Sequence, residues 1–273
     1  MNADATQSPR DDVTDLSSLG IGLFASHREA ASSAEAQLRN RYRFAPPEKA
    51  EILVALGGDG FMLHTLHRML EGECPHLPVF GMNLGTVGFL MNDWQLDGLS
   101  ERISGAKAIR VAPLEMRATT VGGETSTHAA INEVSLLRET RQTAKLEVSV
   151  NDKVRIPELV CDGVLLATPA GSTAYNLSAN GPILPLTSNT LALTPISPFR
   201  PRRWKGAILP DHSRVTLRVR EPAKRPVAAV ADQKEVRDIA EVRLAIDEAS
   251  ELTLLFDKGH SLDERIVSEQ FVA

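Results

Sequence analysis

The segment EILVALGGDGFMLHTLHRML, residues 51–70, decides the fold of the first third of the chain. Its apolar run 52–56 shows no polar alternation, which is typical of a strand buried on both faces of a parallel sheet. Met62, Leu66 and Met69 then recur at helical spacing and predict an amphipathic helix over residues 60–72. The glycine turn GGDG joins the two elements. A strand, a turn and a helix in this order predict a βαβ unit.

The flanking segments repeat this alternation of strand and helix. A short apolar strand is expected at 21–26, and a helix rich in Ala and Glu follows it to about residue 41. Another strand is expected at 78–83, with a second glycine turn at 84–89. We therefore predict an α/β N-terminal domain with a parallel, Rossmann-like sheet over residues 19–110.

The period of the apolar residues changes to two after about Val111. Apolar and polar residues alternate in stretches such as 114–119 and 146–150. This period is typical of half-buried strands in antiparallel sheets that pack face to face. We predict an all-β, sandwich-like C-terminal domain over residues 111–257, and the segment 258–273 is a candidate to rejoin the first domain.

Composition limits the classes of function. The chain has 273 residues, 42% of them hydrophobic, and a net charge of −5, so it lacks the basic surface that nucleic-acid backbones require. No apolar run approaches the roughly 18 residues that span a membrane. The acidic segment 1–18, expected to be a disordered tail, does not resemble a signal peptide. Cys74 and Cys161 form no CxxC pair, which favours a reducing compartment. We predict a cytoplasmic protein that binds neither nucleic acid nor membrane.

An acid at the tightest point of the first glycine turn, Asp59, raises the main chemical question of the sequence. Gly57, Gly58 and Gly60 allow a ligand to approach closely, and the start of the following helix presents N–H groups that suit phosphate. Asp59 would repel phosphate unless Mg²⁺ intervenes or unless its partner is a hydroxyl group. From this turn alone, an N-cap role and a reacting role for Asp59 carry equal weight.

Two further stretches place polar groups on predicted strands or at their ends. NLGTVGF at 83–89 puts Asn83 and the second glycine turn at the same edge of the sheet, although alone it is an ordinary tight turn. INEVSLL at 131–137 puts Asn132 and Glu133 side by side in an apolar strand, so one of them should face the interior. A buried carboxylate needs a partner, and a sugar diol or an amide suits this pair. A strand end at the surface is the alternative.

The segment CDGVLLATPAGSTAYNLSANGP, residues 161–182, has the highest density of glycine and small polar residues. A strand, a Pro-Ala-Gly turn and a short helix at about 172–180 are expected here. Ser172 and Thr173 open that helix, where hydroxyl and N–H groups can both bind a ligand. Tyr175 offers a ring for stacking, and Asp162 offers an acceptor for a ribose or an amide. The sequence has neither the GxSxG elbow of hydrolases nor the HExxH spacing of metalloproteases.

Together, four segments resemble the NAD kinase family in order and spacing: GGDG at 57–60, NLGTVGFL at 83–90, NE at 132–133 and DGVLLATPAGSTAYNLSANGPIL at 162–184. The last segment is close to specific for that family, whereas GGDG also occurs in lipid kinases and phosphofructokinases. The resemblance covers about residues 50–235. It implies an active site between an α/β domain and a β-sandwich, and transfer of the γ-phosphoryl of ATP or polyphosphate to the 2′-hydroxyl of the adenosine ribose of NAD. It also implies a requirement for Mg²⁺ or another divalent cation, and a homodimer or homotetramer.

The resemblance further implies roles for single residues. Asp59 matches the proton acceptor, with Gly60 beside it, and His64 lies one turn along the helix at a contact position. Asn132 and Glu133 match the pair that binds NAD. The rest of the dinucleotide pocket corresponds to Asp162, Thr173, Ala174, Tyr175, Asn176, Leu177, Ser178, Ser197 and Gln233. We assign no residue as a direct metal ligand.

Two other functions are alternatives. One is a GGDG-type kinase that acts on a lipid or a sugar, and the NE pair and the STAY run at 172–175 argue against it. The other is a non-catalytic sensor that binds NAD or NADP, and the presence of Asp59 argues against it.

Overall fold

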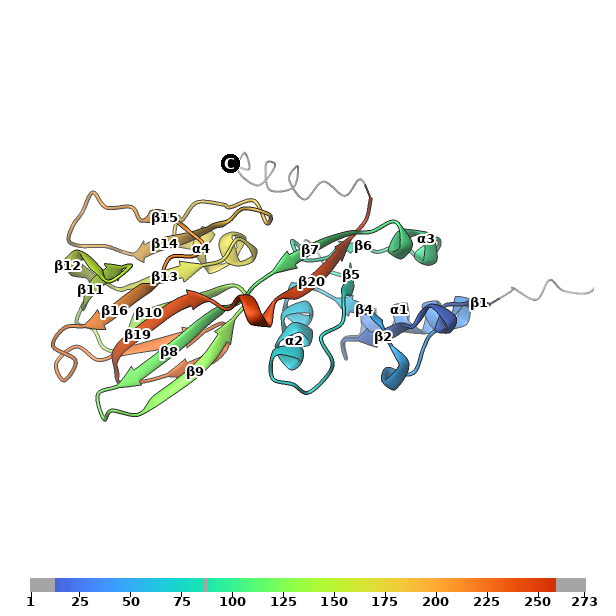
Figure 1. The fold of residues 1–273 in the computed structure, drawn as a ribbon, viewed down its shortest axis with the longest axis horizontal. Helices are drawn as coiled ribbons and strands as arrows, with labels where there is room; N and C mark the ends of the chain where they lie inside the picture. Colours follow the sequence, from blue (N-terminus) through green and yellow to red (C-terminus); the bar gives the residue numbers. More distant parts are fainter. Residues whose placement is uncertain (1–12, 86–87, 259–273) are drawn as a thin grey trace, which may run out of the picture. The chain divides into compact units, whose positions relative to one another are not determined.

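The structure, a computed structural model, describes residues 13–85 and 88–258 (Figure 1). These residues fall into two compact units. The first unit contains residues 13–65, 75–108 and 254–258, and the second contains residues 66–74 and 109–253. Within the described ranges, none of the helices is long and apolar enough to cross a membrane.

The first unit is built on a largely parallel sheet. Its strand order is β2-β4-β5-β20-β7, and β6 also pairs with β5. The strands are β2 (Ile21–Ala25), β4 (Ile52–Gly57), β5 (Val79–Asn83), β6 (Asn92–Asp93), β7 (Lys107–Val111) and β20 (Leu252–Phe256). The pairs β2–β4, β4–β5, β5–β6 and β5–β20 are parallel. The helices are α1 (Glu29–Arg41), α2 (Asp59–Leu70) and α3 (Leu99–Ser104), and the part of α2 from Leu66 onward belongs to the second unit.

Burial along β4 and α2 agrees with the apolar pattern of the sequence. The four residues 54–57 at the end of β4 are all buried, as expected for a strand covered on both faces. Met62, Leu66 and Met69 of α2 are buried as well, and they lie on one face of the helix. The predicted strand–turn–helix unit is confirmed, because β4 and β5 are parallel neighbours with α2 between them in the chain.

The ends of the chain differ from the sequence-based expectation. Thr14–Asp15 forms β1, which pairs with β3 (Tyr42–Arg43), so ordered structure begins inside the segment 1–18 that was expected to be a tail. The strand β20 pairs with β5 rather than with sandwich strands, although it lies before residue 258. The expected return segment 258–273 lies, except for its first residue, outside the described residues. The domain boundary near residue 110 stays a prediction.

The second unit is a sandwich of two antiparallel sheets. One sheet has the order β12-β11-β16-β19-β8-β9, and the other β15-β14-β13-β10-β17-β18. The first sheet consists of β8 (Leu114–Thr120), β9 (Thr125–Ala130), β11 (Ala144–Val150), β12 (Lys153–Cys161), β16 (Val215–Val219) and β19 (Ile239–Ile246). The second consists of β10 (Glu133–Arg138), β13 (Gly163–Ala167), β14 (Thr190–Ile196), β15 (Ala207–Pro210), β17 (Val227–Ala231) and β18 (Lys234–Val236). A short helix, α4 (Tyr175–Ser178), follows a 3-10 turn at Ala170–Thr173.

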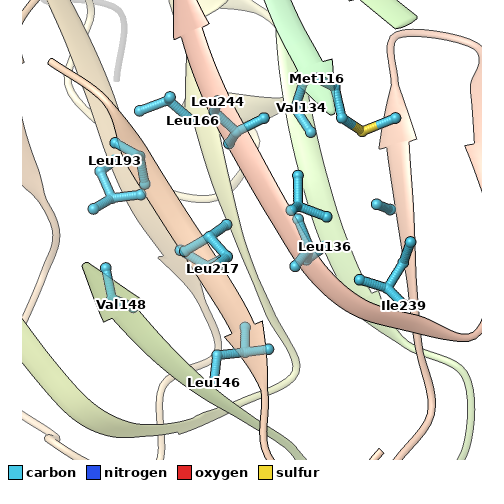
Figure 2. Packing of buried hydrophobic residues seen from close by; sticks show 14 of the residues in the cluster. Met116, Val134, Leu136, Leu146, Val148, Leu166, Leu193, Leu217, Ile239 and Leu244 are labelled. Atoms are coloured by element: carbon cyan, nitrogen blue, oxygen red, sulfur yellow. The ribbon is translucent and has the colours of Figure 1, made fainter. Parts of the chain in front are cut away.

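One aliphatic core joins the two sheets of the sandwich. Figure 2 shows Leu146, Leu217 and Leu244 from the first sheet packed with Leu136 and residues of the second. In β8, buried and exposed residues alternate over 114–118, as the period of two predicts. The predicted fold class, a parallel α/β unit followed by an all-β sandwich, is confirmed.

Candidate active site

The two glycine turns of the first unit meet at Asp59. Asp59 begins α2, and its carboxylate accepts the backbone N–H of Phe89 at Oδ2 (2.8 Å) and that of Leu90 at Oδ1 (3.1 Å). A Cβ added to Gly88 would lie 3.0 Å from Asp59 Oδ1 and 3.2 Å from Asn83 Cγ. Glycine at position 88 therefore lets the second turn come close to both side chains. The predicted pairing of the two turns at one sheet edge is correct.

The hydrogen bonds of Asp59 bear on the choice between a cap and a reacting group. Both carboxylate oxygens are held by the second turn, so the group is oriented by a segment about thirty residues away and not only by its own helix. Asn83 supports the same turn, because its Oδ1 accepts the N–H of Gly85 (2.9 Å). The three glycines of the first turn, Gly57, Gly58 and Gly60, lie at the end of β4 and the start of α2.

The Asn132–Glu133 pair lies at a strand end in the second unit. β10 begins at Glu133, and Asn132 directly precedes it. The strand end is nevertheless not a solvated surface, because Asn132 Oδ1 and Glu133 Oε2 are buried and have no hydrogen-bond partner among residues 13–85 and 88–258. Asn132 and Glu133 are half-buried at this strand end, and their two unpartnered oxygens are shielded from solvent. Buried acceptors without partners are unfavourable in the protein alone, and a ligand with hydroxyl or amide donors would satisfy them.

The charge state of Glu133 is strongly perturbed. Burial raises its pKa from 4.5 to about 7, and the negative charge of Asp232 adds to the effect. A backbone hydrogen bond from Tyr175 partly opposes the rise. At neutral pH this side chain is therefore present both as carboxylate and as carboxylic acid, and it can accept or donate a hydrogen bond.

Asp232 is the residue of this site that the sequence reasoning missed. Its Oδ2 accepts the N–H of Ile131 (2.7 Å), and its Oδ1 accepts those of Asn132 (3.0 Å) and Glu133 (3.2 Å). His67 Nε2 lies 2.7 Å from Oδ2. The predicted contact was its neighbour Gln233, which is exposed in the turn between β17 and β18. The available signal was an acid in the turn ADQ, where Asp232 adopts a φ of 49° that aspartate tolerates better than most residues.

The 170–173 turn packs directly against the Asn132–Glu133 segment. Thr168 donates its N–H to Asn132 O (2.9 Å) and its hydroxyl to Ile131 O (2.6 Å). A Cβ on Gly171 would lie 2.1 Å from Asn132 O, so only glycine fits at this close approach. The Pro-Ala-Gly turn of the sequence thus shapes the site through its backbone.

Two predicted contact residues of this segment are fully buried and hydrogen-bonded within the protein. Ser172 is fully buried, and its hydroxyl bonds Pro169 O (2.7 Å) and Leu184 N (3.0 Å). Asn176 is fully buried too, and its amide bonds Pro182 O (2.8 Å) and the Thr194 hydroxyl (2.6 Å). These two side chains satisfy buried polar groups of the irregular backbone around α4, and their assignment to the ligand pocket stays a prediction.

The other predicted contacts occupy more accessible positions. Thr173, Ala174 and Tyr175 are half-buried, and Leu177, Ser178, Ser197 and His64 are exposed. The Asp162 carboxylate pairs with Arg138 (Nε to Oδ1, 2.6 Å). Burial and the negative charges of Glu133 and Asp162 raise the pKa of Tyr175. Tyr175, Glu133 and Asp162 are therefore close enough within the second unit to influence one another electrostatically.

Solved structures with the same arrangement of strands and helices come from kinases of nicotinamide dinucleotides. Yeast NADH kinase complexed with NADH aligns with a TM-score of 0.74 over 94% of this chain and 87% of that chain, at 22% identity. An NAD kinase from Archaeoglobus fulgidus in complex with ATP aligns with a TM-score of 0.69 over 91% and 97%, also at 22% identity. At this identity the likeness establishes the fold, which is that of NAD kinases.

Sequence relatives establish the family. Residues 131–255 match the ATP-NAD kinase C-terminal domain. The NAD kinase of Rhizorhabdus wittichii is 62% identical over 251 residues, which are 92% of this chain and 97% of that protein. The NAD kinase of Zymomonas mobilis is 59% identical over 249 residues, or 91% and 96%. The chain belongs to the NAD kinase family, and it is a phosphotransferase that phosphorylates NAD.

Proposed function

We propose that this chain transfers the γ-phosphoryl of ATP to the 2′-hydroxyl of the adenosine ribose of NAD, with Asp59 as the proton acceptor and Asn132 and Glu133 as the dinucleotide-binding pair. The observation that carries the binding role is the pair of buried oxygens, Asn132 Oδ1 and Glu133 Oε2, without partners in the described residues. NAD supplies ribose hydroxyl and amide donors that match them.

The binding pair is suited to neutral donor groups. Asn132 Oδ1 accepts a hydroxyl or amide hydrogen. Glu133, with a pKa of about 7, accepts as carboxylate and donates as carboxylic acid. Tyr175 and Asp162 are proposed to contact the same ligand, and the effect of Glu133 and Asp162 on the pKa of Tyr175 supports their closeness.

Asp59 orients the attacking hydroxyl and removes its proton. The bond from the 2′-oxygen to the γ-phosphorus forms while the bond from that phosphorus to the oxygen of ADP breaks, and the 2′-hydroxyl proton passes to the Asp59 carboxylate. An ordinary aspartate, with a pKa of about 3.9, is a weak base, so orientation precedes proton transfer. The N–H groups of Phe89 and Leu90 hold the carboxylate for this role.

The proposed reaction also requires a divalent cation that binds to ATP, the phosphoryl donor. In the described ranges no three His, Cys, Asp or Glu side chains form a group that could hold a metal ion. Mg²⁺ commonly keeps several waters and binds through substrate phosphates with one or two carboxylates. The described residues fit a cation that would bind mainly through ATP and would supply charge neutralisation of the phosphates.

We also propose a homodimer or homotetramer in the cytoplasm. The oligomer is supported by the resemblance to the family, and light scattering of the purified protein measures it. The location is supported by Cys74 and Cys161, which are both free thiols.

A donor and acceptor screen tests the proposed reaction. The protein is incubated with Mg²⁺, NAD and either ATP or polyphosphate, and the product is detected with an NADP-specific dehydrogenase. Asn132→Ala and Glu133→Gln should raise the KM for NAD by about tenfold or more with an unchanged KM for ATP. The matched control is Glu124→Gln, which removes a carboxylate from an exposed turn. Unchanged KM values for NAD in both variants would remove the pair from the binding role.

A further inference from the structure

Three consecutive backbone N–H groups converge on one buried carboxylate. Ile131, Asn132 and Glu133 donate to Asp232 over 2.7, 3.0 and 3.2 Å. Only 4% of the Asp232 side chain is exposed. The turn between β17 and β18, which carries Asp232, is thereby fixed to the start of β10, and Asp232 N–H donates back to Glu133 O (3.2 Å).

Successive N–H groups in a turn form a concavity that binds anions, including phosphate. At residues 131–133 the protein's own carboxylate occupies this concavity. The N–H groups of residues 131–133 are then all hydrogen-bonded to Asp232. The acceptors Asn132 Oδ1 and Glu133 Oε2 of this segment have no partner in the described ranges. Such a turn attracts hydroxyl and amide donors, and it has no backbone N–H group left to offer a phosphate.

We propose that Asp232 is a positioning residue that fills the anion-binding turn at 131–133, so that this turn binds the hydroxyl and amide groups of NAD and rejects phosphate. The proposal rests on the proposed function, in which Asn132 and Glu133 bind the dinucleotide. Asp232 acts through these residues and does not itself contact the substrate.

His67 completes the arrangement from α2. Its Nε2 lies 2.7 Å from the same Asp232 oxygen that accepts the N–H of Ile131, and 15% of its side chain is exposed. With the proton on Nε2, His67 donates a fourth hydrogen bond and holds the carboxylate in the turn. The charge of Asp232 also acts on Glu133, whose other titratable neighbour is Tyr175 of α4.

The test compares Asp232→Asn and Asp232→Ala with Asp152→Asn. Asparagine tolerates the positive φ of position 232, so the first variant removes the charge and keeps the turn. Asp152 is a matched control, because it also has a positive φ (60°) in a turn between strands and its side chain is 86% exposed. The readouts are kcat, the KM for NAD and for ATP, and inhibition by inorganic phosphate.

Asp232→Asn should raise the KM for NAD about tenfold or more, with kcat and the KM for ATP within about threefold of the parent. Its pH profile of NAD binding should shift to lower pH, because the like charge beside Glu133 is gone. Asp232→Ala should acquire inhibition by inorganic phosphate that is competitive with NAD, and added formate should lower its KM for NAD. Asp152→Asn should match the parent protein in every readout.

A merely structural role gives a different result. Equal losses for NAD and ATP, without phosphate inhibition and without rescue by formate, would overturn the proposal. If the Asp232 variants do not fold, His67→Leu is tested in their place. A KM for NAD in His67→Leu equal to that of the parent would then overturn the proposal. If the KM for NAD is raised in Asn132→Ala and Glu133→Gln but equals that of the parent in Asp232→Asn, the positioning role of Asp232 is refuted and the proposed function is not. Normal values in those two variants would refute the proposed function itself.

Discussion

Replacing Glu133 by glutamine should lower the affinity for NAD and raise the stability of the folded protein, and the gain in stability should depend on pH. In the folded protein, burial and the charge of Asp232 raise the pKa of Glu133 from 4.5 to about 7. The folded state therefore holds the proton more tightly than the unfolded chain. The resulting stability is fully present below about pH 4.5 and is lost as the pH rises through about 7. The loss is about 3 kcal/mol.

Glutamine does not titrate, so it does not show this loss. Relative to the parent, Glu133→Gln should gain stability between about pH 5 and about pH 8, by up to about 3 kcal/mol. Its KM for NAD should nevertheless be higher, because a neutral amide oxygen is a weaker hydrogen-bond acceptor than a carboxylate oxygen. The variant is thus expected to be the more stable protein at alkaline pH and the poorer enzyme.

Urea unfolding across this pH range measures the effect. Trp204 packs against the sandwich core and reports unfolding of the second unit, so both proteins are compared in a Trp94→Phe background. Glu124→Gln, at an exposed turn, is the control for removal of a carboxylate. Parallel stability curves for the parent and Glu133→Gln would refute the reasoning, since they would mean that Glu133 titrates alike in the folded and unfolded states.

The contacts of the site lead to three further predictions. Asp59→Asn should keep NAD binding, measured by calorimetry, but lose about a hundredfold or more in kcat, and near-parental turnover would exclude it as the base. Gly171→Ala places a Cβ 2.1 Å from Asn132 O and should raise the KM for NAD and lower the melting temperature, whereas Gly122→Ala, with its nearest neighbour at 3.7 Å, should do neither. Asn176→Ala leaves buried groups without partners and should lower the free energy of unfolding by about 2–4 kcal/mol, measured by urea unfolding; an unchanged free energy of unfolding would refute this structural role.

Local pattern predicted most of the regular elements. The apolar run at 52–56 and the helical spacing of Met62, Leu66 and Met69 correspond to β4 and α2. The period of two after Val111 corresponds to the sandwich strands. Such patterns are local because a strand or a helix repeats over a few residues, and the side of the element that is buried follows from that repeat. The strand β20 was not anticipated in the parallel sheet, because its pairing with β5 joins residues far apart in the chain.

The site was predicted in part. Asn132 and Glu133 were found because a polar pair interrupts an apolar stretch, and this is visible in the sequence. Ser172 and Asn176 were assigned to the ligand pocket because the segment around them has no period that separates inner from outer positions. In the structure they satisfy buried groups of their own loop.

The sequence by itself determined the family chemistry: an acid in a glycine turn, a polar pair in an apolar stretch, and a long segment close to specific for NAD kinases. Only the tertiary structure decided how these groups are held. Asp232 lies 101 residues from Ile131 and 165 from His67, yet its carboxylate binds both. No local repeat encodes such contacts. The contact with Ile131 arises from the antiparallel pairing of β10 with β17, which brings the turn after β17 to the start of β10.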